Sequence, residues 1–247
     1  ASTSVTDAGA CDMYIIATKA AGAVHAAEAI APFVGADTAV VTIQNGLGAA
    51  ARITEHIPSD AVVVGVAQGF GAAMVGPGHS HQNGMQMLRL GELDGGETAR
   101  LRNVADVWAD AGFPVQTFDD IDQLIWEKFI CNVAVGGPSL VSRLPIGELL
   151  ASETWRPVAM GCATEAFDVA KALGVNVSFD DPAAYVDAFG AKLPDAKPSM
   201  LQDYENGRRS ELDAINGQVV EQGRRARVPT PHNDRICELV REMEKDL

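Results

Sequence analysis

The chain has 247 residues, 47% of them hydrophobic, which is enough to bury one large core or two smaller ones without disulfides or metals. Its formal net charge of −14 excludes nucleic acid and anionic membranes as expected partners, because such partners bind clustered Lys and Arg. The sequence has no apolar run near the roughly 20 residues that span a bilayer, and its four cysteines form no CxxC pair, so we expect a cytoplasmic protein.

The first half of the chain alternates short apolar runs with alanine-rich helical stretches, a pattern typical of parallel strands joined by crossover helices. Strands are expected at residues 13–17, 39–43, 61–67 and 115–118, and helices at 20–33 and 97–111. Residues 69–93 should form an antiparallel hairpin, because they contain Gly-Pro-Gly and Asn-Gly turn signals. His79 and His81 have no third ligand at metal spacing, so we expect no metal site.

The second half, from Ile121 onward, contains only helical patterns. Breaks are expected at Gly136-Gly137-Pro138, at Gly174, at Asp181-Pro182 and at residues 194–198. Acidic residues at 119–122 precede the first helix, and we place the domain boundary there. The chain is thus predicted to be an α/β protein with domains at 1–119 and 120–247.

The first segment that could carry chemistry follows the strand at 39–43 and reads Gln44-Asn45-Gly46-Leu47-Gly48. In open parallel sheets, ligands bind outside the carboxyl ends of the strands, so Asn45 could contact a cofactor or a substrate. An ordinary Asn-Gly turn explains the same residues. Lys19 follows the first strand in the same way, and it could either reach a phosphate or ribose or remain a solvated lysine.

The second segment contains Lys128 and Asn132, which are four residues apart and therefore share one helix face. Their neighbours are apolar, and a lysine surrounded by apolar groups is a proton donor nearer to neutral pH. The alternative is that Lys128 extends to water and that Asn132 caps a backbone group.

The third segment runs from Lys197 to Gly217. Ser199 and Gln202 have capping-box spacing, which predicts a helix N-terminus at Ser199 where a carboxylate could bind. Glu211 would lie roughly 18 Å further along a straight helix, so both residues could not contact one small acid. The alternatives are a plain cap for Ser199 and a pair with Arg208 for Glu211.

These segments resemble the ketopantoate reductase (2-dehydropantoate 2-reductase) family in order and separation. The matching motifs are Gln44-Asn45-Gly46, Lys128 with Asn132, Ser199-Met200-Leu201-Gln202-Asp203, Glu211-Leu212-Asp213 and Val228-Pro229-Thr230-Pro231-His232-Asn233. The resemblance implies a partial Rossmann-type dinucleotide-binding domain followed by an all-helical domain of the 6-phosphogluconate dehydrogenase-like kind.

The resemblance also implies a function: NADPH-dependent reduction of a 2-oxoacid, with 2-dehydropantoate in pantothenate biosynthesis as the expected substrate. Lys128 would be the catalytic general acid, and Asn132 and Ser199 would bind the substrate. Lys19, Asn45 and Glu211 would serve the cofactor, with a substrate hydroxyl as the alternative partner of Glu211. A homodimer is the expected assembly.

Two features depart from the family pattern. Family members have a strand and a GxGxxG turn some sixty residues before the stretch that matches Asp12 to Lys19, and the sequence given has neither. We expect that the protein has a further N-terminal part; the alternative is a cofactor-free interaction or dimerisation module. Gly136 replaces an asparagine that contacts the distal hydroxyl of the substrate in the family, so reduction of another 2-oxoacid is a second alternative.

Overall fold

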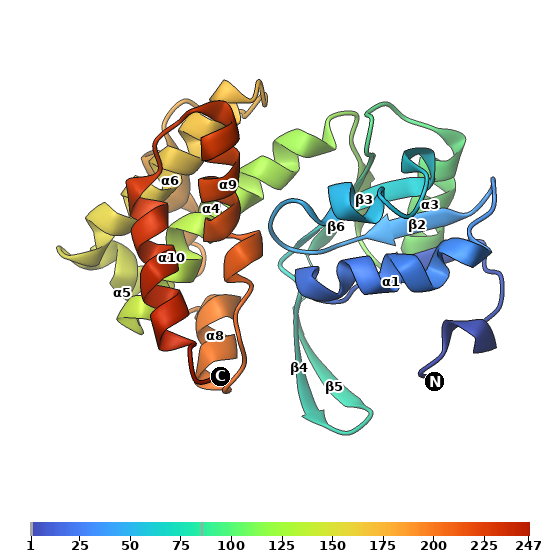
Figure 1. The fold of residues 1–247 in the computed structure, drawn as a ribbon, viewed down its shortest axis with the longest axis horizontal. Helices are drawn as coiled ribbons and strands as arrows, with labels where there is room; N and C mark the ends of the chain where they lie inside the picture. Colours follow the sequence, from blue (N-terminus) through green and yellow to red (C-terminus); the bar gives the residue numbers. More distant parts are fainter. Residues whose placement is uncertain (1, 85) are drawn as a thin grey trace. The chain divides into compact units, whose positions relative to one another are not determined.

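The computed structural model describes residues 2–84 and 86–247, which form two compact units (Figure 1). The sheet unit contains Ala1–Gln44 and Ala49–Asp122, and the helical unit contains Asn45–Gly48 and Gln123–Leu247. The short loop Asn45–Gly48 is thus part of the helical unit, although it follows a strand of the sheet unit. None of the helices described is long and apolar enough to cross a lipid bilayer.

The sheet unit is built on five strands in the order β1-β2-β3-β6-β7. The strands are β1 (Met13–Ile16), β2 (Ala39–Thr42), β3 (Val62–Gln68), β6 (Met87–Glu92) and β7 (Val115–Thr117). β1, β2 and β3 pair in parallel, β6 pairs antiparallel to β3, and β7 pairs in parallel with β6. All four residues of β2 are buried, as expected for a parallel strand with both faces covered.

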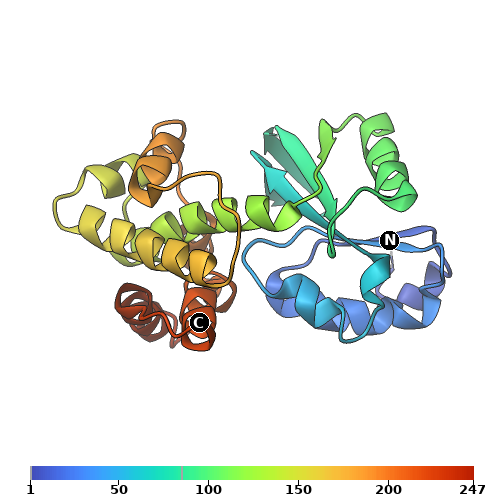
Figure 2. The same cartoon turned by 90° about the horizontal axis from the view of Figure 1, so that it is seen from above.

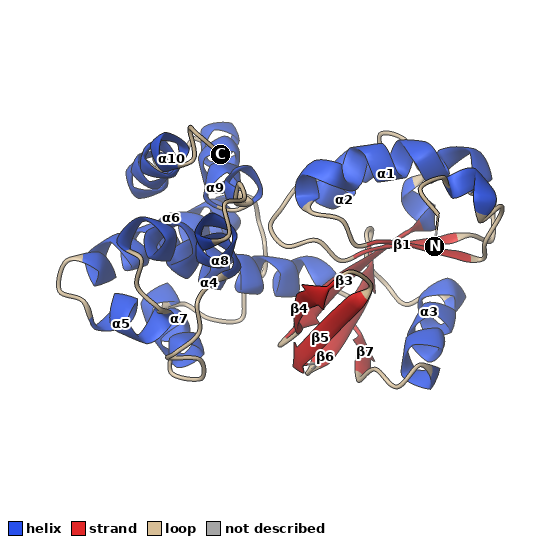
Figure 3. Ribbon diagram, turned by 90° about the horizontal axis from the view of Figure 1, so that it is seen from below, coloured by secondary structure: helices blue, strands red, loops and turns tan. Residues whose placement is uncertain are grey.

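Helices cover both faces of this sheet. Figure 3 shows α1 (Ala23–Ile30) and α2 (Ala49–Ile53) on one face and α3 (Ala99–Asp110) on the other. Short 3-10 turns lie at η1 (Val5–Asp7), η2 (Ala20–Gly22), η3 (Ala31–Phe33) and η4 (Ser59–Ala61). On the α3 face, Leu101 and Val104 pack against Val41 and Val63 of the central strands. The observed strands and helices confirm the predicted α/β arrangement of this half.

The predicted hairpin at 69–93 is wrong in its extent. β4 (Gly71–Gly76) and β5 (His79–Gly84) form a separate two-stranded antiparallel sheet, and β6 returns to the main sheet. Leu88 and Leu90 of β6 are fully buried, and this burial favours pairing with β3 over a longer hairpin. Met85, within the predicted hairpin, lies outside the described residues.

The helical unit has no strand in its described residues, which confirms the all-helical prediction. Its helices are α4 (Ile121–Ser142), α5 (Ile146–Ala151), α6 (Trp155–Ala172), α7 (Pro182–Gly190), α8 (Ser199–Glu205), α9 (Asn216–Ala226) and α10 (Pro231–Met243), with a 3-10 turn η5 (Leu212–Ala214). The predicted breaks near Gly174, Asp181-Pro182 and residues 194–198 are present. Asp181 caps α7 by accepting hydrogen bonds from the amides of Ala183 and Ala184.

The predicted break at Gly136-Gly137-Pro138 is wrong, because α4 continues through all three residues to Ser142. Figure 2 shows α4, in light green, as one continuous helix. A side chain at position 137 would collide with Ile236 and Asn216, so Gly137 allows neighbouring segments to approach closely. Tertiary packing thus overrides the local preference of Gly and Pro to end a helix.

Glu165 of α6 organises a buried polar network that fixes the start of α10. Its carboxylate accepts hydrogen bonds from the backbone amides of His232 and Asn233 at 2.7 and 3.0 Å, and from the Asn233 side chain at 2.7 Å. Asn233 Oδ1 accepts a hydrogen bond from Asn216 Nδ2, which also bonds to the carbonyl of Val133 on α4. The motif at 228–233 therefore contributes to the scaffold that holds α4.

Candidate active site

The candidate site centres on a contact between Lys128 of α4 and Asn45, which lies just beyond β2. Lys128 Nζ donates a hydrogen bond to Asn45 Oδ1 at 2.8 Å, although the two residues are 83 positions apart in the sequence. Lys128 is half-buried, and its neighbours Phe129 and Ile130 are fully buried. The ammonium is thus anchored inside the protein on an amide oxygen instead of extending into water.

The surroundings of Lys128 lower the pKa of its ammonium group to about 8. Burial is the main cause, because it disfavours the charged form, and the negative charge of Glu211 acts in the opposite direction. The apolar neighbours of Lys128 in the sequence predicted this direction correctly. A lysine with such a pKa is largely protonated at neutral pH and can still release its proton during a reaction.

Two glycines fix the backbone of the loop that carries Asn45. Gly46 and Gly48 have φ angles of +82° and +83°, a region that glycine adopts without strain. A Cβ atom at Gly46 would lie 2.1 Å from the carbonyl oxygen of Ala214, and the amide of Leu47 donates a hydrogen bond to that same oxygen at 3.0 Å. The loop is therefore held against η5, and this packing sets the position of Asn45 next to Lys128.

The α4 face that carries Lys128 continues through Asn132 and Gly136. These residues recur every four positions, so they lie on the same side of the helix. Asn132 is half-buried, and Gly136 is buried against Met200 of α8 and Ile215, which follows η5. The sequence did not single out Met200 or Ile215 as possible neighbours of the site. Met200 stood only within the motif Ser199-Met200-Leu201-Gln202-Asp203, and Ile215 only within the third segment.

Ser199 is the first residue of α8, as predicted, and it is exposed. The predicted capping box is wrong, because Gln202 Nε2 donates its hydrogen bond to the carbonyl of Lys197 at 2.7 Å. Pro198 occupies the N-cap position, and it lacks the backbone N–H from which a capping-box Gln would accept a hydrogen bond. Contact between Met200 and the Gly136 position nevertheless brings the start of α8 to the α4 face.

Glu211 acts electrostatically on Lys128, as described above. The predicted straight helix from Ser199 to Glu211 is wrong: α8 ends at Glu205, and Gly207 adopts φ +66° in the turn that follows. The predicted separation of these residues therefore no longer holds. Arg208, the alternative partner of Glu211, donates a hydrogen bond to Asp203 at 3.0 Å.

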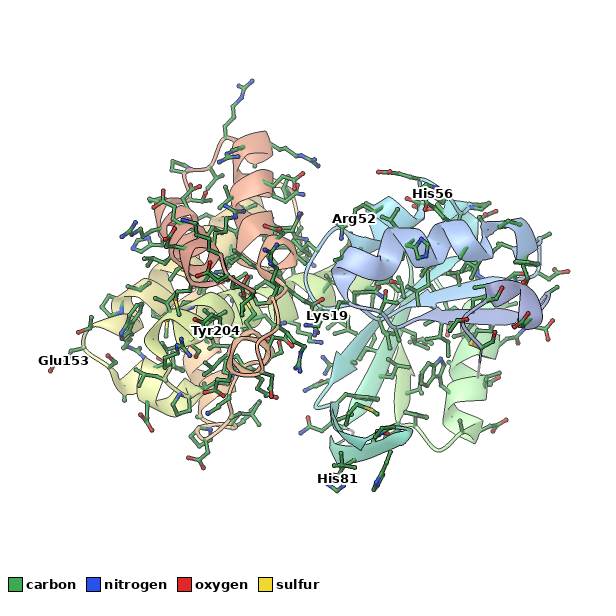
Figure 4. All side chains as sticks on the ribbon, turned by 60° about the horizontal axis from the view of Figure 1, so that its bottom comes forward. Lys19, Arg52, His56, His81, Glu153 and Tyr204 are labelled. Atoms are coloured by element: carbon green, nitrogen blue, oxygen red, sulfur yellow. The ribbon has the colours of Figure 1, made fainter. Side chains whose placement is uncertain are left out.

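Lys19 belongs to the sheet unit, where it is exposed at the loop after β1 (Figure 4). Its two sequence neighbours are held by side chains from nearby segments. Gln44 Nε2 donates hydrogen bonds to the carbonyls of Ile16 and Thr18, and Arg52 Nη2 donates one to the carbonyl of Ala20. The loop is thus fixed at the carboxyl edge of the parallel strands, which is the edge where such sheets bind ligands.

Both halves of the chain match one protein family. The family described as "Ketopantoate reductase PanE/ApbA" matches residues 1–95, and "Ketopantoate reductase PanE/ApbA C terminal" matches residues 120–244. A 2-dehydropantoate 2-reductase from Streptococcus pyogenes serotype M3 is 30% identical over 234 residues, which cover 94% of this chain and 76% of that protein. Alignments to the first curated relatives span between 57% and 77% of their length.

Solved structures agree with this match. A PanE/ApbA family ketopantoate reductase from Ralstonia eutropha JMP134 is 30% identical, with a TM-score of 0.88 over 97% of this chain and 78% of the other. A structure described as D-mandelate dehydrogenase with NADH and anilino(oxo)acetate is 26% identical, with a TM-score of 0.86 over 95% of this chain and 77% of the other. Similar structures therefore bear the names of different enzymes.

Proposed function

Because the chain belongs to the ketopantoate reductase family, we propose that it reduces the keto group of a 2-oxoacid with NADPH and gives the 2-hydroxyacid. The observation that carries this proposal is the Lys128 ammonium, which has a pKa of about 8 and a fixed partner in Asn45. A ketone that accepts a hydride also needs a proton at its oxygen, and Lys128 is suited to deliver one.

Lys128 in the helical unit fits the proton transfer that accompanies such a hydride transfer. When bound, the reduced nicotinamide cofactor supplies the hydride that adds to the keto carbon. As the carbonyl π electrons move to oxygen, the Lys128 ammonium stabilises the growing negative charge and transfers its proton to that atom. Lys128 is left as a neutral amine, which regains a proton from solvent. The charge of Glu211 favours this return to the ammonium form.

The remaining residues have proposed binding roles. Asn132, one helical turn from Lys128, would orient the substrate through its amide, and the exposed hydroxyl of Ser199 would bind the carboxylate. Asn45 holds Lys128 and would also contact the cofactor. Lys19 would pair with a cofactor phosphate or ribose, and Glu211 with the nicotinamide ribose or a substrate hydroxyl. A homodimer is the proposed assembly, to be checked by light scattering.

The substrate within this class has two candidates. The curated relatives are named for 2-dehydropantoate, which makes that acid the first to test. A different 2-oxoacid is the second candidate, supported by Gly136 and by the structural similarity to D-mandelate dehydrogenase. The structure of that dehydrogenase is a complex with NADH, so both reduced nicotinamide cofactors belong in the assay.

The test is a fluorescence titration of the protein with NADPH and with NADH, followed by cofactor oxidation in the presence of 2-dehydropantoate and a panel of other 2-oxoacids. The proposal predicts saturable binding and oxidation that depends on the oxoacid. Absence of binding to both cofactors by the full-length protein would contradict it, and the cofactor-free interaction module would then replace the reductase as the proposed function.

A further inference from the structure

A cavity lies in the helical unit between residues 209–213 and residues 241–245, at the end of α10 and just beyond it. Its volume is about 320 Å³, which falls within the range of sites for small molecules, roughly 300 to 1,000 Å³. Lys128, Asn132 and Ser199 are not among the residues that line it. The function proposed above therefore makes no use of this cavity.

The two segments that line the cavity are joined directly to each other. Three hydrogen bonds of 2.8 to 3.0 Å connect them, from Arg209 Nε to the carbonyl of Leu247, from the amide of Ser210 to Glu244 Oε1, and from Arg241 Nη2 to Asp213 Oδ1. These contacts hold the walls in place without any ligand, so the cavity is largely preformed, as binding sites for small molecules usually are.

The cavity has an excess of positive charge in a strongly acidic chain. The formal net charge of the chain is −14, yet the cavity is lined by three cations, Arg209, Arg241 and Lys245, and by two carboxylates. Both carboxylates already accept a hydrogen bond from the opposite wall. Lys245 Nζ lies 3.7 Å from Glu242, an exposed contact of little strength. Because a guanidinium has five N–H donors and an ammonium has three, the cations keep donors for an anion.

Ser210 adds a hydroxyl that lacks a hydrogen-bond partner among the described residues. Its Oγ atom is buried, and a buried hydroxyl without a hydrogen bond costs free energy. Such a group in a folded protein calls for a water, an ion or a ligand. Ser210 lines the cavity, and rotation about a single bond moves Oγ between staggered positions, so the hydroxyl can donate to an acceptor in the cavity.

We infer that this cavity binds a small phosphate monoester, at a site separate from that of the 2-oxoacid. A phosphate monoester carries a charge of about −1.5 to −2 at pH 7 and three acceptor oxygens. It therefore matches three cations and a hydroxyl better than a single carboxylate does. A cavity of this volume also leaves room for the carbon part of the ligand. The inference goes beyond the reductase function and does not depend on it.

Calorimetric titration of the full-length protein with glycerol 3-phosphate tests the site, and glycerol is the matched neutral probe. We expect saturable binding of the phosphate ester that weakens as the salt concentration rises, and no binding of glycerol. Absence of saturable binding of glycerol 3-phosphate up to about 10 mM would overturn the inference.

Variants distinguish this cavity from the phosphate sites of a bound cofactor. Arg209→Gln and Arg241→Gln should each raise the Kd for glycerol 3-phosphate about tenfold, because each removes a charge-assisted hydrogen bond. Arg235→Gln on α10 is the matched control, since Arg235 is exposed, pairs with Glu238 and does not line the cavity. Equal Kd values in the wild type and in both cavity variants would place the phosphate elsewhere and overturn the inference.

Ser210→Ala gives a readout that a purely structural role would not produce. Because Oγ has no partner among the described residues, its removal should leave the free energy of unfolding unchanged or raise it, while the Kd for glycerol 3-phosphate rises. A less stable variant with an unchanged Kd would contradict the role of the hydroxyl in the site. Calorimetry needs no turnover, so failure of the reductase function would leave these results as they are.

Discussion

Replacing Glu211 with glutamine should move the alkaline limb of the pH–rate profile to lower pH. The pKa of Lys128 is about 8, so the ammonium is about nine-tenths protonated at pH 7 and about one-tenth at pH 9. If Lys128 must be protonated to deliver its proton, kcat/KM for the wild type falls about tenfold between these two values. Glu211 raises the pKa of Lys128, so Glu211→Gln lowers it and shifts the limb in the acid direction.

The assay is steady-state oxoacid reduction at saturating NADPH across the range from about pH 6 to 10, which brackets the Lys128 pKa of about 8. Asp213→Asn is the matched control, because this exposed carboxylate lies two positions away and pairs with Arg241, and it should leave the limb in place. Lys128→Arg should remove the limb, since a guanidinium keeps its proton throughout this range. A limb at the same pH in Glu211→Gln, or a wild-type rate that stays flat into alkaline solution, would refute this account of Lys128.

Three further predictions concern the scaffold and the thiols. Gly174→Ala should lower the free energy of unfolding by about 1 kcal/mol, and Gly46→Ala should lower it by more, because position 174 shares the positive φ angle but has open space around it. Equal melting temperatures of the two variants would count against the tight packing of Gly46 on η5. Glu165→Ala should lower the free energy of unfolding by about 3 kcal/mol, because it leaves several buried hydrogen-bond donors unpaired. The exposed control Glu238→Ala should change this free energy by less than about 0.5 kcal/mol, and denaturant titration measures both. Titration of the native protein with a thiol reagent should modify Cys11 first, because the other three cysteines are buried with raised pKa values; fast reaction of all four would contradict that burial.

Local patterns in the sequence were sufficient to predict most of the secondary structure. The strand at Ala39–Thr42 and the helix at Ala99–Asp110 follow from apolar periodicity and turn residues, which are properties of neighbouring positions. The helix break at Gly136-Gly137-Pro138 could not be judged in this way, because contacts of Gly137 with Asn216 and Ile236 come from distant segments. The antiparallel return of β6 was missed for the same reason.

In the candidate site, too, single residues could be predicted from their own segments, but contacts between distant segments could not. Lys128, Asn45 and Glu211 were each found from their own segments, and burial of Lys128 followed from its apolar neighbours. The hydrogen bond between Lys128 and Asn45 joins residues 83 positions apart, and no local pattern predicts it. The turn at Gly207 ends the expected straight helix, so the electrostatic effect of Glu211 on Lys128 could not be inferred from the sequence.

The most direct test of the central claim compares NADPH oxidation by the wild-type protein and by Lys128→Ala, each with a 2-oxoacid that the wild type reduces. We expect the wild type to turn over and kcat of the variant to be lower by about two to four orders of magnitude, because proton delivery and charge stabilisation are both lost. A folded Lys128→Ala protein whose kcat remains within about threefold of the wild type would contradict the role of Lys128 as the proton donor.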